Sequence, residues 1–435
     1  MTKPIYKKAY MPRIAFFEDR TASQFTPLAL LRPVFELLCG HFSNRERCCS
    51  RLRDADWGAV VRPELVEVYA EEHPQAIVNQ DDWLQQRPIL LVNGRCLIEP
   101  GQLLELQPNT SAWIGETLAA IYLSSTKAVT TDAILQGKAL LELAKETSSV
   151  EIDGTVLSYP WDLISENSRW LCHDFNQRPK PAEITALDSR VAVLGPADQV
   201  FIDATARLDP FIVIDVTSGP VWIDRDARIQ AFTRIEGPAY IGPQTELFRA
   251  NVRAGCSFGP VCRLGGEIEE SIVHGYANKY HDGFLGHSYV CPWVNLGALT
   301  TNSDLKNDYS NVSVPLAGES IKSGSRKVGC FLGDHTKTAL GSLFNTGSSI
   351  GVMSLVLPAG ELLPKHIPSF TRFWHGNIEP LPNGIQSSLE TARVAMSRRN
   401  QTLTPAMERL LQHLHAQTEN ERQKAISRTR FTKTL

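Results

Sequence analysis

Large apolar residues recur every six positions between residues 202 and 264, and this spacing organises the middle of the chain. They form three runs: Ile202, Leu208 and Ile214; Ile223, Ile229, Ile235, Ile241 and Leu247; Val252, Phe258 and Leu264. Most are followed four positions later by a small residue: Ala206, Ser218, Ala227, Thr233, Ala239, Thr245, Cys256 and Cys262. A period of six fits neither a helix nor an alternating strand. It predicts a solenoid of short strands and corners, with the large residues inside.

The spacing lapses over residues 266–308, which are rich in His, Asn, Gly and Tyr, and it resumes at Phe344, Ile350 and Val356. We interpret the lapse as an interruption of the solenoid, because long departures from a repeat usually form loops that carry function. The repeat as a whole predicts a solenoid domain over residues 186–380.

Apolar runs alternate with helix-like stretches before the solenoid. The runs typical of buried strands are 14–17, 59–61, 76–78 and 89–92. The stretches with helical character are 34–39, 132–145 and 161–175. This alternation predicts an α/β domain over residues 12–176, followed by a proline-containing linker over 177–185.

The end of the chain has helical periodicity. Met407, Leu410, Leu411 and Leu414 share one helical face, and Thr404-Pro405 supplies an N-cap with proline at the first helical position. A helical tail is therefore expected over residues 381–435. Its basic residues either bind a phosphate group or form a solvated face, which we favour: Arg393, Arg398, Arg399, Arg422, Lys424, Arg428, Arg430 and Lys433.

Composition narrows the class of protein. The 435 residues carry a net charge of −3, which gives no reason to expect nucleic-acid or membrane binding. Nine cysteines without a CxxC pair indicate core packing in a reducing cytoplasm rather than disulfides or a cysteine zinc site. Residues 1–11 lack the apolar stretch of a secretory signal, and we expect a disordered extension there.

Three motifs point to a known family. They are DRTASQFTPLALLRP at 19–33, GYANKYHDGFLG at 275–286, and VNLGA at 294–298 together with GDHTKT at 333–338. With them the chain resembles the sugar-nucleotidyltransferase-like proteins related to the bifunctional N-acetylglucosamine-1-phosphate uridylyltransferase/glucosamine-1-phosphate acetyltransferase. The resemblance implies an α/β nucleotidyltransferase-like (Rossmann-like) domain joined to a left-handed parallel β-helix of hexapeptide repeats. It also implies a homotrimer with active sites at the subunit clefts.

Acyl transfer from acetyl-CoA to an amine needs a general base, oxyanion donors and cations for the cofactor's phosphates. His281 resembles the histidine of the family's HxxYxGD-type motif and is the candidate base, with a hydrogen-bonded loop histidine as the structural alternative. The acid that the family places after Leu285-Gly286 is here His287. Candidate substrate-binding residues are Asn278, Lys279, Asn302, Asp304 and Lys306. Candidate CoA-binding residues are Arg326, Lys327, His335 and Lys337.

A zinc reading stays open beside this one. Left-handed β-helices also host carbonic-anhydrase-like hydratases whose zinc is held by histidines of adjacent subunits. His274, His281 and His287 lie close together in the sequence, and three neutral imidazoles form a sound zinc set. Their spacing does not resemble that family's closely paired histidines, so we keep zinc as a minor alternative.

The first domain departs from the nucleotidyltransferase pattern at two places. Residues 18–23, after the first strand, contain no glycine, and Arg95 stands where the family has a magnesium-binding aspartate. Candidate nucleotide-binding residues are Arg20, Arg32, Asn93 and Arg95. Magnesium would be needed if this domain is active, with Asp19, Asp81 or Asp82 as its ligand.

The sequence therefore predicts a transferase that acts on sugar phosphates or nucleotide sugars. Acetyl transfer from acetyl-CoA is assigned to the solenoid, and sugar-1-phosphate nucleotidyl transfer to the first domain, where the two departures argue against it. The alternative is a non-catalytic nucleotide-sugar sensor or scaffold that keeps the fold without the chemistry.

Overall fold

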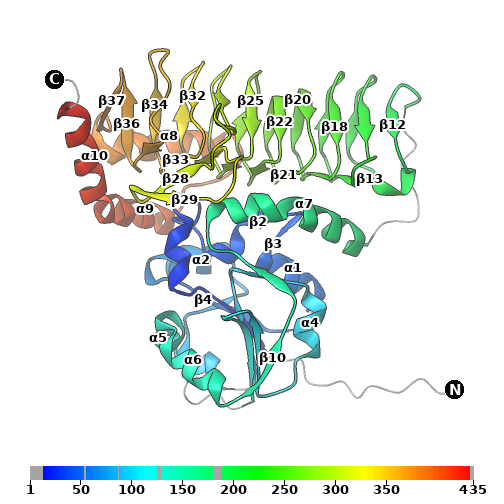
Figure 1. The fold of residues 1–435 in the computed structure, drawn as a ribbon, viewed down its shortest axis with the longest axis vertical. Coiled ribbons are helices and arrows are strands. Elements are labelled where there is room, and N and C mark those ends of the chain that lie inside the picture. The colour runs from blue at the N-terminus through cyan, green and yellow to red at the C-terminus, as the bar shows by residue number, and fades with distance from the viewer. Residues whose placement is uncertain (1–12, 53–54, 87, 125–128, 180–187, 432–435) are drawn as a thin grey trace. The chain divides into compact units, whose positions relative to one another are not determined.

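The computed structural model describes residues 13–52, 55–86, 88–124, 129–179 and 188–431 (Figure 1). The extension expected at 1–11, and the linker expected at 177–185 from residue 180 onward, lie outside the described residues. The chain divides into two compact units. The first comprises residues up to Ser23, Arg32–Leu37 and Ser43–Ser158, and the second comprises Gln24–Leu31, Leu38–Phe42 and Tyr159–Leu435.

The first unit is built on a seven-stranded sheet with the order β10-β8-β9-β6-β1-β4-β5. Its strands are β1 (Arg13–Phe17), β4 (Trp57–Val60), β5 (Ile77–Val78), β6 (Ile89–Asn93), β8 (Thr110–Ile114), β9 (Thr117–Leu123) and β10 (Ser148–Glu151). Strand β1 is buried along its length and pairs in parallel with β4 and β6, whereas β9 is antiparallel to β6 and β8. The four predicted strand runs are confirmed, and the sheet is mixed rather than all parallel.

Helices connect these strands. They are α1 (Asn44–Arg51), α2 (Val66–Glu72), α3 (Asp81–Leu84), α4 (Pro100–Glu105), α5 (Thr131–Gln136) and α6 (Lys138–Lys145), with short strands β2 (Leu38–Cys39), β3 (Phe42–Ser43), β7 (Cys96–Ile98) and β11 (Gly154–Val156) nearby in the chain. The helix predicted at 34–39 is wrong, because a 3-10 turn at Val34–Glu36 leads into β2. The helix predicted at 132–145 is split by Gly137, whose φ is +76°.

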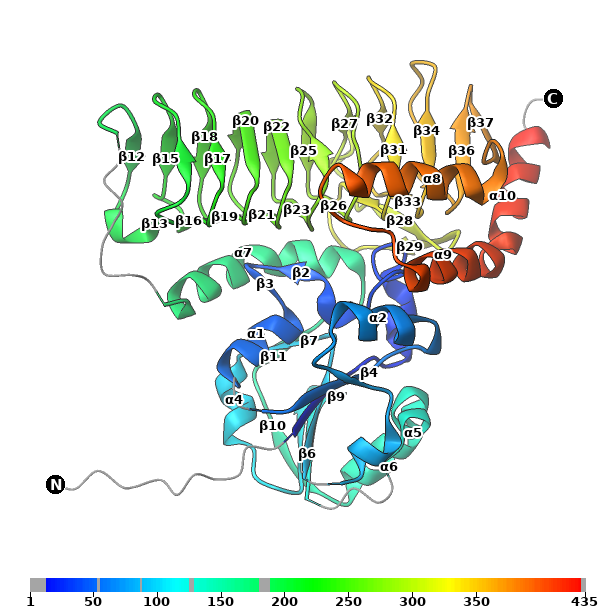
Figure 2. The ribbon, with the colours of Figure 1, turned by 180° about the vertical axis from the view of Figure 1, so that it is seen from behind.

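The second unit consists mainly of short parallel strands that pair from coil to coil (Figures 1 and 2). One row contains β13 (Val200–Ile202), β16 (Val221–Ile223), β19 (Ala239–Ile241), β21 (Cys256–Phe258), β23 (Ile272–Val273), β26 (Tyr289–Val290), β30 (Cys330–Leu332), β33 (Ser348–Ile350) and β35 (His366–Ile367). A second contains β14 (Arg207–Leu208), β17 (Arg228–Ile229), β20 (Glu246–Val252), β22 (Arg263–Glu269), β24 (Asn278–Lys279), β31 (Lys337–Thr338), β34 (Leu355–Leu357), β36 (Thr371–Trp374) and the antiparallel β37 (Asn377–Pro380). A third contains β12 (Ala192–Leu194), β15 (Val213–Asp215), β18 (Arg234–Glu236), the second halves of β20 and β22, β25 (Phe284–Gly286), β27 (Thr301–Asn302) and β32 (Leu343–Phe344). These parallel rows are consistent with a β-helix, and its left-handed twist stays a prediction.

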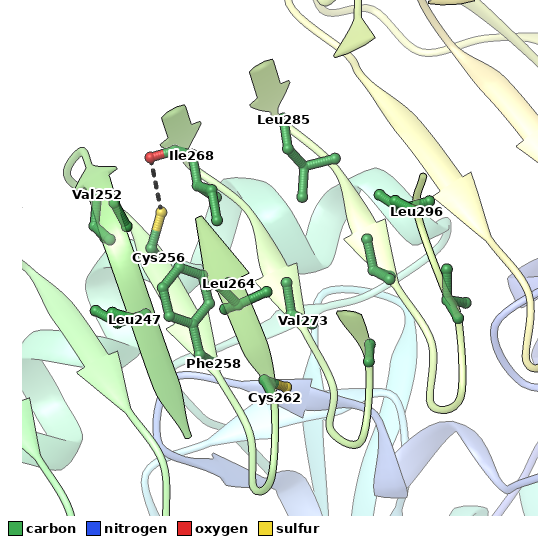
Figure 3. Close-up of a cluster of buried hydrophobic side chains, with 14 of the residues drawn as sticks. Leu247, Val252, Cys256, Phe258, Cys262, Leu264, Ile268, Val273, Leu285 and Leu296 are labelled. Carbon is green, nitrogen blue, oxygen red and sulfur yellow. Dashed lines mark hydrogen bonds between the residues drawn. The ribbon is translucent and has the colours of Figure 1, made fainter. Parts of the chain in front are cut away.

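The residues of the six-residue spacing fill the interior of the coils. Ile235, Val252 and Ile268 stand at one register position on successive strands and are completely buried. Figure 3 shows Val252 and Ile268 with their neighbours in the interior. Most of the predicted small residues are buried as well, including Ala227, Thr245, Cys256 and Cys262. Ser218 is exposed instead, in the segment where the spacing is interrupted by an insertion.

The interruption predicted over 266–308 is wrong. Strands β23 to β27 continue the parallel pairing through this segment. The spacing is concealed because two inward register positions hold polar residues, namely Lys279 opposite Leu264 and Asn302 opposite Phe344. The true excursion starts after β27 and contains an antiparallel hairpin of β28 (Ser313–Leu316) and β29 (Glu319–Lys322).

Helices cover parts of the coil surface. Helix α7 (Pro160–Gln177) packs Leu171 and Phe175 against Trp222 and Tyr240. The predicted helical tail is confirmed as α8 (Gly384–Ser397), α9 (Pro405–Gln417) and α10 (Glu419–Phe431). Ile426 of α10 joins the core of the coils and helps to cover their last strands. Within the described ranges, no helix is both long and apolar enough to cross a membrane.

Candidate functional site

A row of polar side chains runs across successive coils of the second unit. Arg263 of β22 pairs with Asn278 of β24, Asn278 with Asn295, and Asn295 with Lys337 of β31. These residues alternate with the inward positions of the same strands, so their side chains point out of the coil. Neighbouring strands lie about 4.8 Å apart, and Asn278 Nδ2 donates to Asn295 Oδ1 at 3.1 Å. The row therefore forms a continuous polar floor.

Helix α8 lies alongside the coils (Figure 2). Its residues and those that follow it form the other wall of a groove above this floor. Two adjoining cavities of about 650 Å³ and 450 Å³ lie between helix and coils. Both are lined by Asn278, Asn295, Arg398 and Arg399, so we treat them as one site, the coil–helix groove. Arg399 Nη2 donates to Asn278 Oδ1 at 3.2 Å and so ties the end of the helix to the floor.

Aromatic rings line the larger cavity. Tyr276 stacks on Trp293 with ring centroids 4.6 Å apart, and Trp293 stacks on His335 at 6.0 Å. All three residues occupy coil corners with φ between 52° and 65°. Lys337 Nζ donates to the carbonyl of Trp293, and burial lowers the pKa of Lys337 to about 8. The larger cavity thus combines planar apolar surface with one partly buried ammonium group.

The candidate base His281 lines the smaller cavity. Its ring is exposed and lies edge-on to Tyr280, which stacks on Phe248 at 4.7 Å. The structure thus places His281 and Asn278 in one chamber, with Lys337 in the adjoining part of the groove. His335 reaches this region through its contact with Trp293.

Lys279 does not line the groove, contrary to the substrate-binding role that the sequence predicted for it. The side chain points into the coil, is 3% exposed, and donates to the carbonyl oxygens of Gly265, His281 and Gly283 at 2.9, 3.2 and 2.7 Å. Those bonds use all three ammonium protons. Burial lowers the pKa of Lys279 to about 8, and the Asp282 and Glu267 charges oppose that shift. Lys279 therefore holds the turn that carries His281.

We expect Lys279→Met to lower the free energy of unfolding by about 1–3 kcal/mol, because buried carbonyls lose a charged donor. Lys322→Met is the matched control, since Lys322 is an exposed hairpin lysine whose removal should change stability by less than about 0.5 kcal/mol. Urea unfolding of both variants measures the difference. Equal stability of Lys279→Met and wild type would contradict this role.

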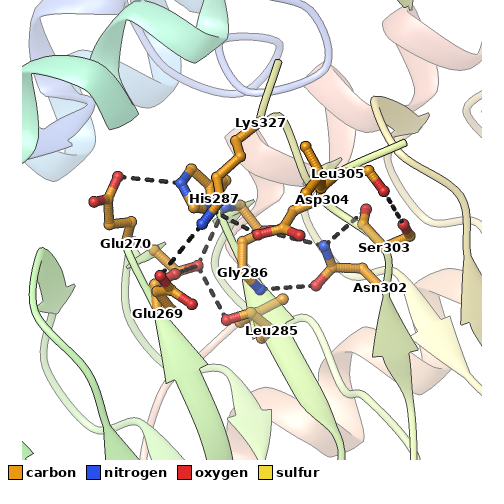
Figure 4. Close-up of polar contacts among 12 residues, drawn as sticks. Glu269, Glu270, Leu285, Gly286, His287, Asn302, Ser303, Asp304, Leu305 and Lys327 are labelled. Carbon is orange, nitrogen blue, oxygen red and sulfur yellow. Dashed lines mark hydrogen bonds and ion pairs between the residues drawn. The ribbon is translucent and has the colours of Figure 1, made fainter. Parts of the chain in front are cut away.

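A second polar cluster lies at a different corner of the coils (Figure 4). His287 Nδ1 is 2.8 Å from Asp304 Oδ2, and His287 Nε2 is 3.2 Å from Glu270 Oε2. Lys327 Nζ lies 3.5 Å from Glu269 Oε1 beside them. Since Asp304 and Lys327 stand near the two ends of the excursion, the cluster fastens its base to the coils. Asp304 and Lys327, for which contacts with substrate and with CoA were predicted, therefore lie outside the coil–helix groove.

Burial by itself would lower the pKa of His287, but its contacts with Asp304 and Glu270 outweigh burial and raise the pKa to about 9. A raised pKa contributes stability below the unfolded value of about 6.5, and this stability is lost as the pH rises toward 9. The protonated ring thus strengthens the cluster at neutral pH.

We expect stability to fall by about 2 kcal/mol between pH 6.5 and pH 9 through this histidine. His287→Gln should remove that part of the pH dependence, whereas His413→Gln, at an exposed position of α9, should keep it. Urea unfolding at the two pH values measures the effect. A wild-type slope that survives in His287→Gln would show that other groups carry it.

Three further predicted site residues lie away from the groove. Asn302 is buried; its side chain accepts from the amide of Gly286 at 2.9 Å and donates to the carbonyl of Gly286 at 3.0 Å. These contacts contradict its predicted role in substrate binding. Lys306 Nζ donates to Ser310 Oγ and to the carbonyl of Asn311. Arg326 is exposed on the excursion. The polar floor therefore replaces the excursion as the candidate binding surface.

The three-histidine zinc set is not assembled within one chain. His274 Nδ1 contacts Tyr289 Oη at 2.8 Å, whereas His287 lies between two carboxylates and His281 opens into the groove. In the part of the chain that the structure describes, no group of three histidine, cysteine or acidic side chains is placed to hold a metal ion.

Polar residues of the first unit gather where strands β1 and β6 end. Asp19 follows β1, and Asn93 is the last residue of β6, its parallel neighbour. Arg95 Nε lies 2.8 and 2.7 Å from the two oxygens of Asp19, and Asn93 Nδ2 donates to Asp19 at 3.1 Å. Strand β1 lies between β4 and β6, so the chain leaves β1 for a neighbour on one side and later returns to its other side. Ligands of α/β sheets bind at such a switch point in the strand order.

Only some of the predicted nucleotide-binding residues of this unit lie at Asp19. Arg95 and Asn93 meet at Asp19, whereas Arg20 Nη2 donates to Gln136 Oε1 at 2.7 Å. The carbonyl of Arg32 accepts from Arg62 Nη2 at 3.3 Å. The structure therefore brings two of the four predicted nucleotide-binding residues into direct contact with one carboxylate.

These residues do not fit a magnesium site. Mg²⁺ takes carboxylate oxygens as ligands, but both oxygens of Asp19 are engaged by Arg95. The neighbouring carboxylate, Glu18, accepts from the amide of Val34 and from Arg62 Nε, each at 3.1 Å. The guanidinium of Arg95 thus neutralises Asp19, and a cation is already present at the edge where the metal was expected.

Comparison with known proteins agrees with this architecture. Residues 14–180 match a family model described as sugar nucleotidyl transferase. The chain is 33% identical over 152 residues to the bifunctional sugar-1-phosphate nucleotidylyltransferase/acetyltransferase of Sulfurisphaera tokodaii, a match that covers 32% of this chain and 36% of that protein. The resemblance inferred from the motifs is thereby confirmed.

A second relative is the bifunctional protein GlmU of Methanococcus maripaludis, 30% identical over 228 residues that cover 52% of this chain and 48% of the relative. The chain therefore spans about half or less of the length of these curated relatives. A solved GDP-perosamine N-acetyl transferase from Caulobacter crescentus is 13% identical and covers 41% of this chain and 55% of that one, at a TM-score of 0.11. That score is too low to bear on the fold.

Proposed function

We propose that the second unit transfers an acetyl group from acetyl-CoA to an amino or hydroxyl group of a sugar phosphate or nucleotide sugar in the coil–helix groove. The observation that carries this proposal is the chamber in which His281 faces the polar floor and a set of cations. The names of the relatives, which include an acetyltransferase, support the reaction class.

His281 acts as the general base in this proposal. An acceptor nitrogen or oxygen attacks the carbonyl carbon of the thioester while His281 takes its proton, and the C–S bond then breaks. Coenzyme A leaves as the thiolate and receives a proton in turn. Asn278 and Asn295 supply amide groups that orient the acceptor, and Lys337 supplies charge for a phosphate in the larger cavity.

Three further features belong to the same proposal. The coils form a left-handed β-helix, the chain assembles as a homotrimer, and the trimer works in the cytoplasm. The parallel rows of strands support the first of these. Six cysteines that form no disulfide, namely Cys48, Cys49, Cys96, Cys256, Cys262 and Cys330, have a pKa raised by burial to about 11 or 12 and support a reducing compartment.

We expect acetyl-CoA to release free thiol when the purified chain is supplied with the correct amino-sugar phosphate or nucleotide-linked amino sugar. His281→Ala should slow this release at least a hundredfold, the usual contribution of a general base. His413→Ala, at an exposed position of α9, should leave the rate unchanged. A folded His281→Ala variant with the wild-type rate would remove the catalytic assignment.

The first unit favours a different function, which is nucleotide-sugar binding without nucleotidyl transfer. The Asp19–Arg95 ion pair carries this proposal, because it occupies the carboxylate that a metal-dependent transfer would use. Arg95 Nε and Nη1 are engaged by Asp19 and by the carbonyl of Leu157, so Nη2 is the donor that this guanidinium would offer to a diphosphate, with Asn93 beside it.

We expect a UDP- or dTDP-linked sugar to bind with the same affinity in EDTA and in magnesium, as measured by isothermal titration calorimetry. Arg95→Gln should weaken binding at least tenfold, whereas Arg51→Gln, on the exposed end of α1, should not. Magnesium-dependent release of pyrophosphate from a nucleoside triphosphate and a sugar 1-phosphate would refute the binding-only function.

A further inference from the structure

Three guanidinium groups line the chamber that contains His281. Arg263 comes from the floor, at the start of β22, whereas Arg398 and Arg399 follow helix α8 on the opposite wall. The three residues come from segments far apart in the sequence, and the fold brings them to a cavity of about 450 Å³. Gathering like charges costs free energy unless an anion compensates them.

The acidic groups of the chain compensate only part of this charge. Arg263 pairs with Glu246, but the same carboxylate also lies 3.6 Å from Arg228. Among the described residues, no ion pair joins Arg398 or Arg399 to a carboxylate, and the contact of Arg399 with Asn278 is to a neutral amide. The chamber therefore keeps a positive charge that faces its open volume.

The position of Arg398 at the end of α8 offers a simpler explanation. Cations near a helix C-terminus gain about 0.3–1 kcal/mol from the helix dipole. That effect does not explain why Arg399 turns toward Asn278 or why Arg263 meets it from the coil. Burial, followed by the charges of Arg263 and Arg398, lowers the pKa of Arg399, so each cation makes the others less favourable.

We propose that Arg263, Arg398 and Arg399 bind a phosphoryl group of a ligand that occupies the His281 chamber. This proposal rests on the proposed acyl transfer for its choice of ligands, because both the sugar phosphate and coenzyme A carry phosphoryl groups. Guanidinium groups bind phosphate through paired, charge-assisted hydrogen bonds, and three of them suit a dianion. The tail thus supplies part of the binding site instead of a solvated face.

The test measures binding without turnover, so its failure is distinct from failure of acetyl transfer. The full chain is titrated by calorimetry with inorganic pyrophosphate, a hexosamine 1-phosphate and adenosine 3′,5′-bisphosphate. The Arg398→Gln/Arg399→Gln double variant should lose at least tenfold in affinity for pyrophosphate. Arg225→Gln, an exposed coil arginine outside the groove, should bind as wild type.

The two organic probes identify the source of the phosphate. A loss confined to hexosamine 1-phosphate assigns the site to the acceptor, and a loss confined to the bisphosphate assigns it to coenzyme A. The Arg398→Lys/Arg399→Lys variant keeps the charge and should recover part of the affinity, provided that thermal unfolding shows all variants folded. Unchanged pyrophosphate binding in the double glutamine variant, or an equal loss in Arg225→Gln, would overturn the proposal.

Discussion

The in-register stacking of short parallel strands is the constraint on which the second unit depends. Because each coil pairs with the next at the same position, residues of the same character, apolar or polar, form a row across successive coils. Inward positions form apolar rows such as Ile235, Val252 and Ile268. Outward positions form polar rows, and the row from Arg263 to Lys337 is the floor of the groove. The apolar core and the polar floor are therefore the inward and outward sides of the same stacked strands.

A polar residue at an inward position is informative, because burying it costs free energy unless it finds hydrogen-bond partners. Lys279 takes an inward position that its neighbours give to Leu264 and Leu247, and a buried ammonium needs several acceptors to offset the loss of water. It finds them in the carbonyls of the turn around His281. A lysine in the core thus shapes the surface above it, which links the interior of the coil to the proposed chemistry.

The six-residue spacing was enough to predict stacked short strands and the residues that fill their interior, because large inward residues recur wherever short strands stack in register. It could not predict that coils continue through 266–308, since Lys279 and Asn302 look like surface residues when they are read alone. The groove could not be predicted from the sequence either. Arg398 and Arg399 stand more than a hundred residues from Asn278, and only the folded chain shows that α8 returns to the coil.

The two units differ in how their charges are arranged, and this difference bears on their functions. In the first unit, Arg95 neutralises Asp19 and Arg62 pairs with Glu18, so these two described carboxylates at the edge of the sheet already have cationic partners. In the second, Arg398 and Arg399 remain without a carboxylate partner in the described chain, and they line the chamber beside His281 where we propose that a phosphoryl group binds. A neutralised site suits binding with little chemistry, and a site with uncompensated charge beside a base suits a phosphorylated substrate. Acetyl transfer is therefore expected in the coils, although the family match, over residues 14–180, lies mostly in the first unit.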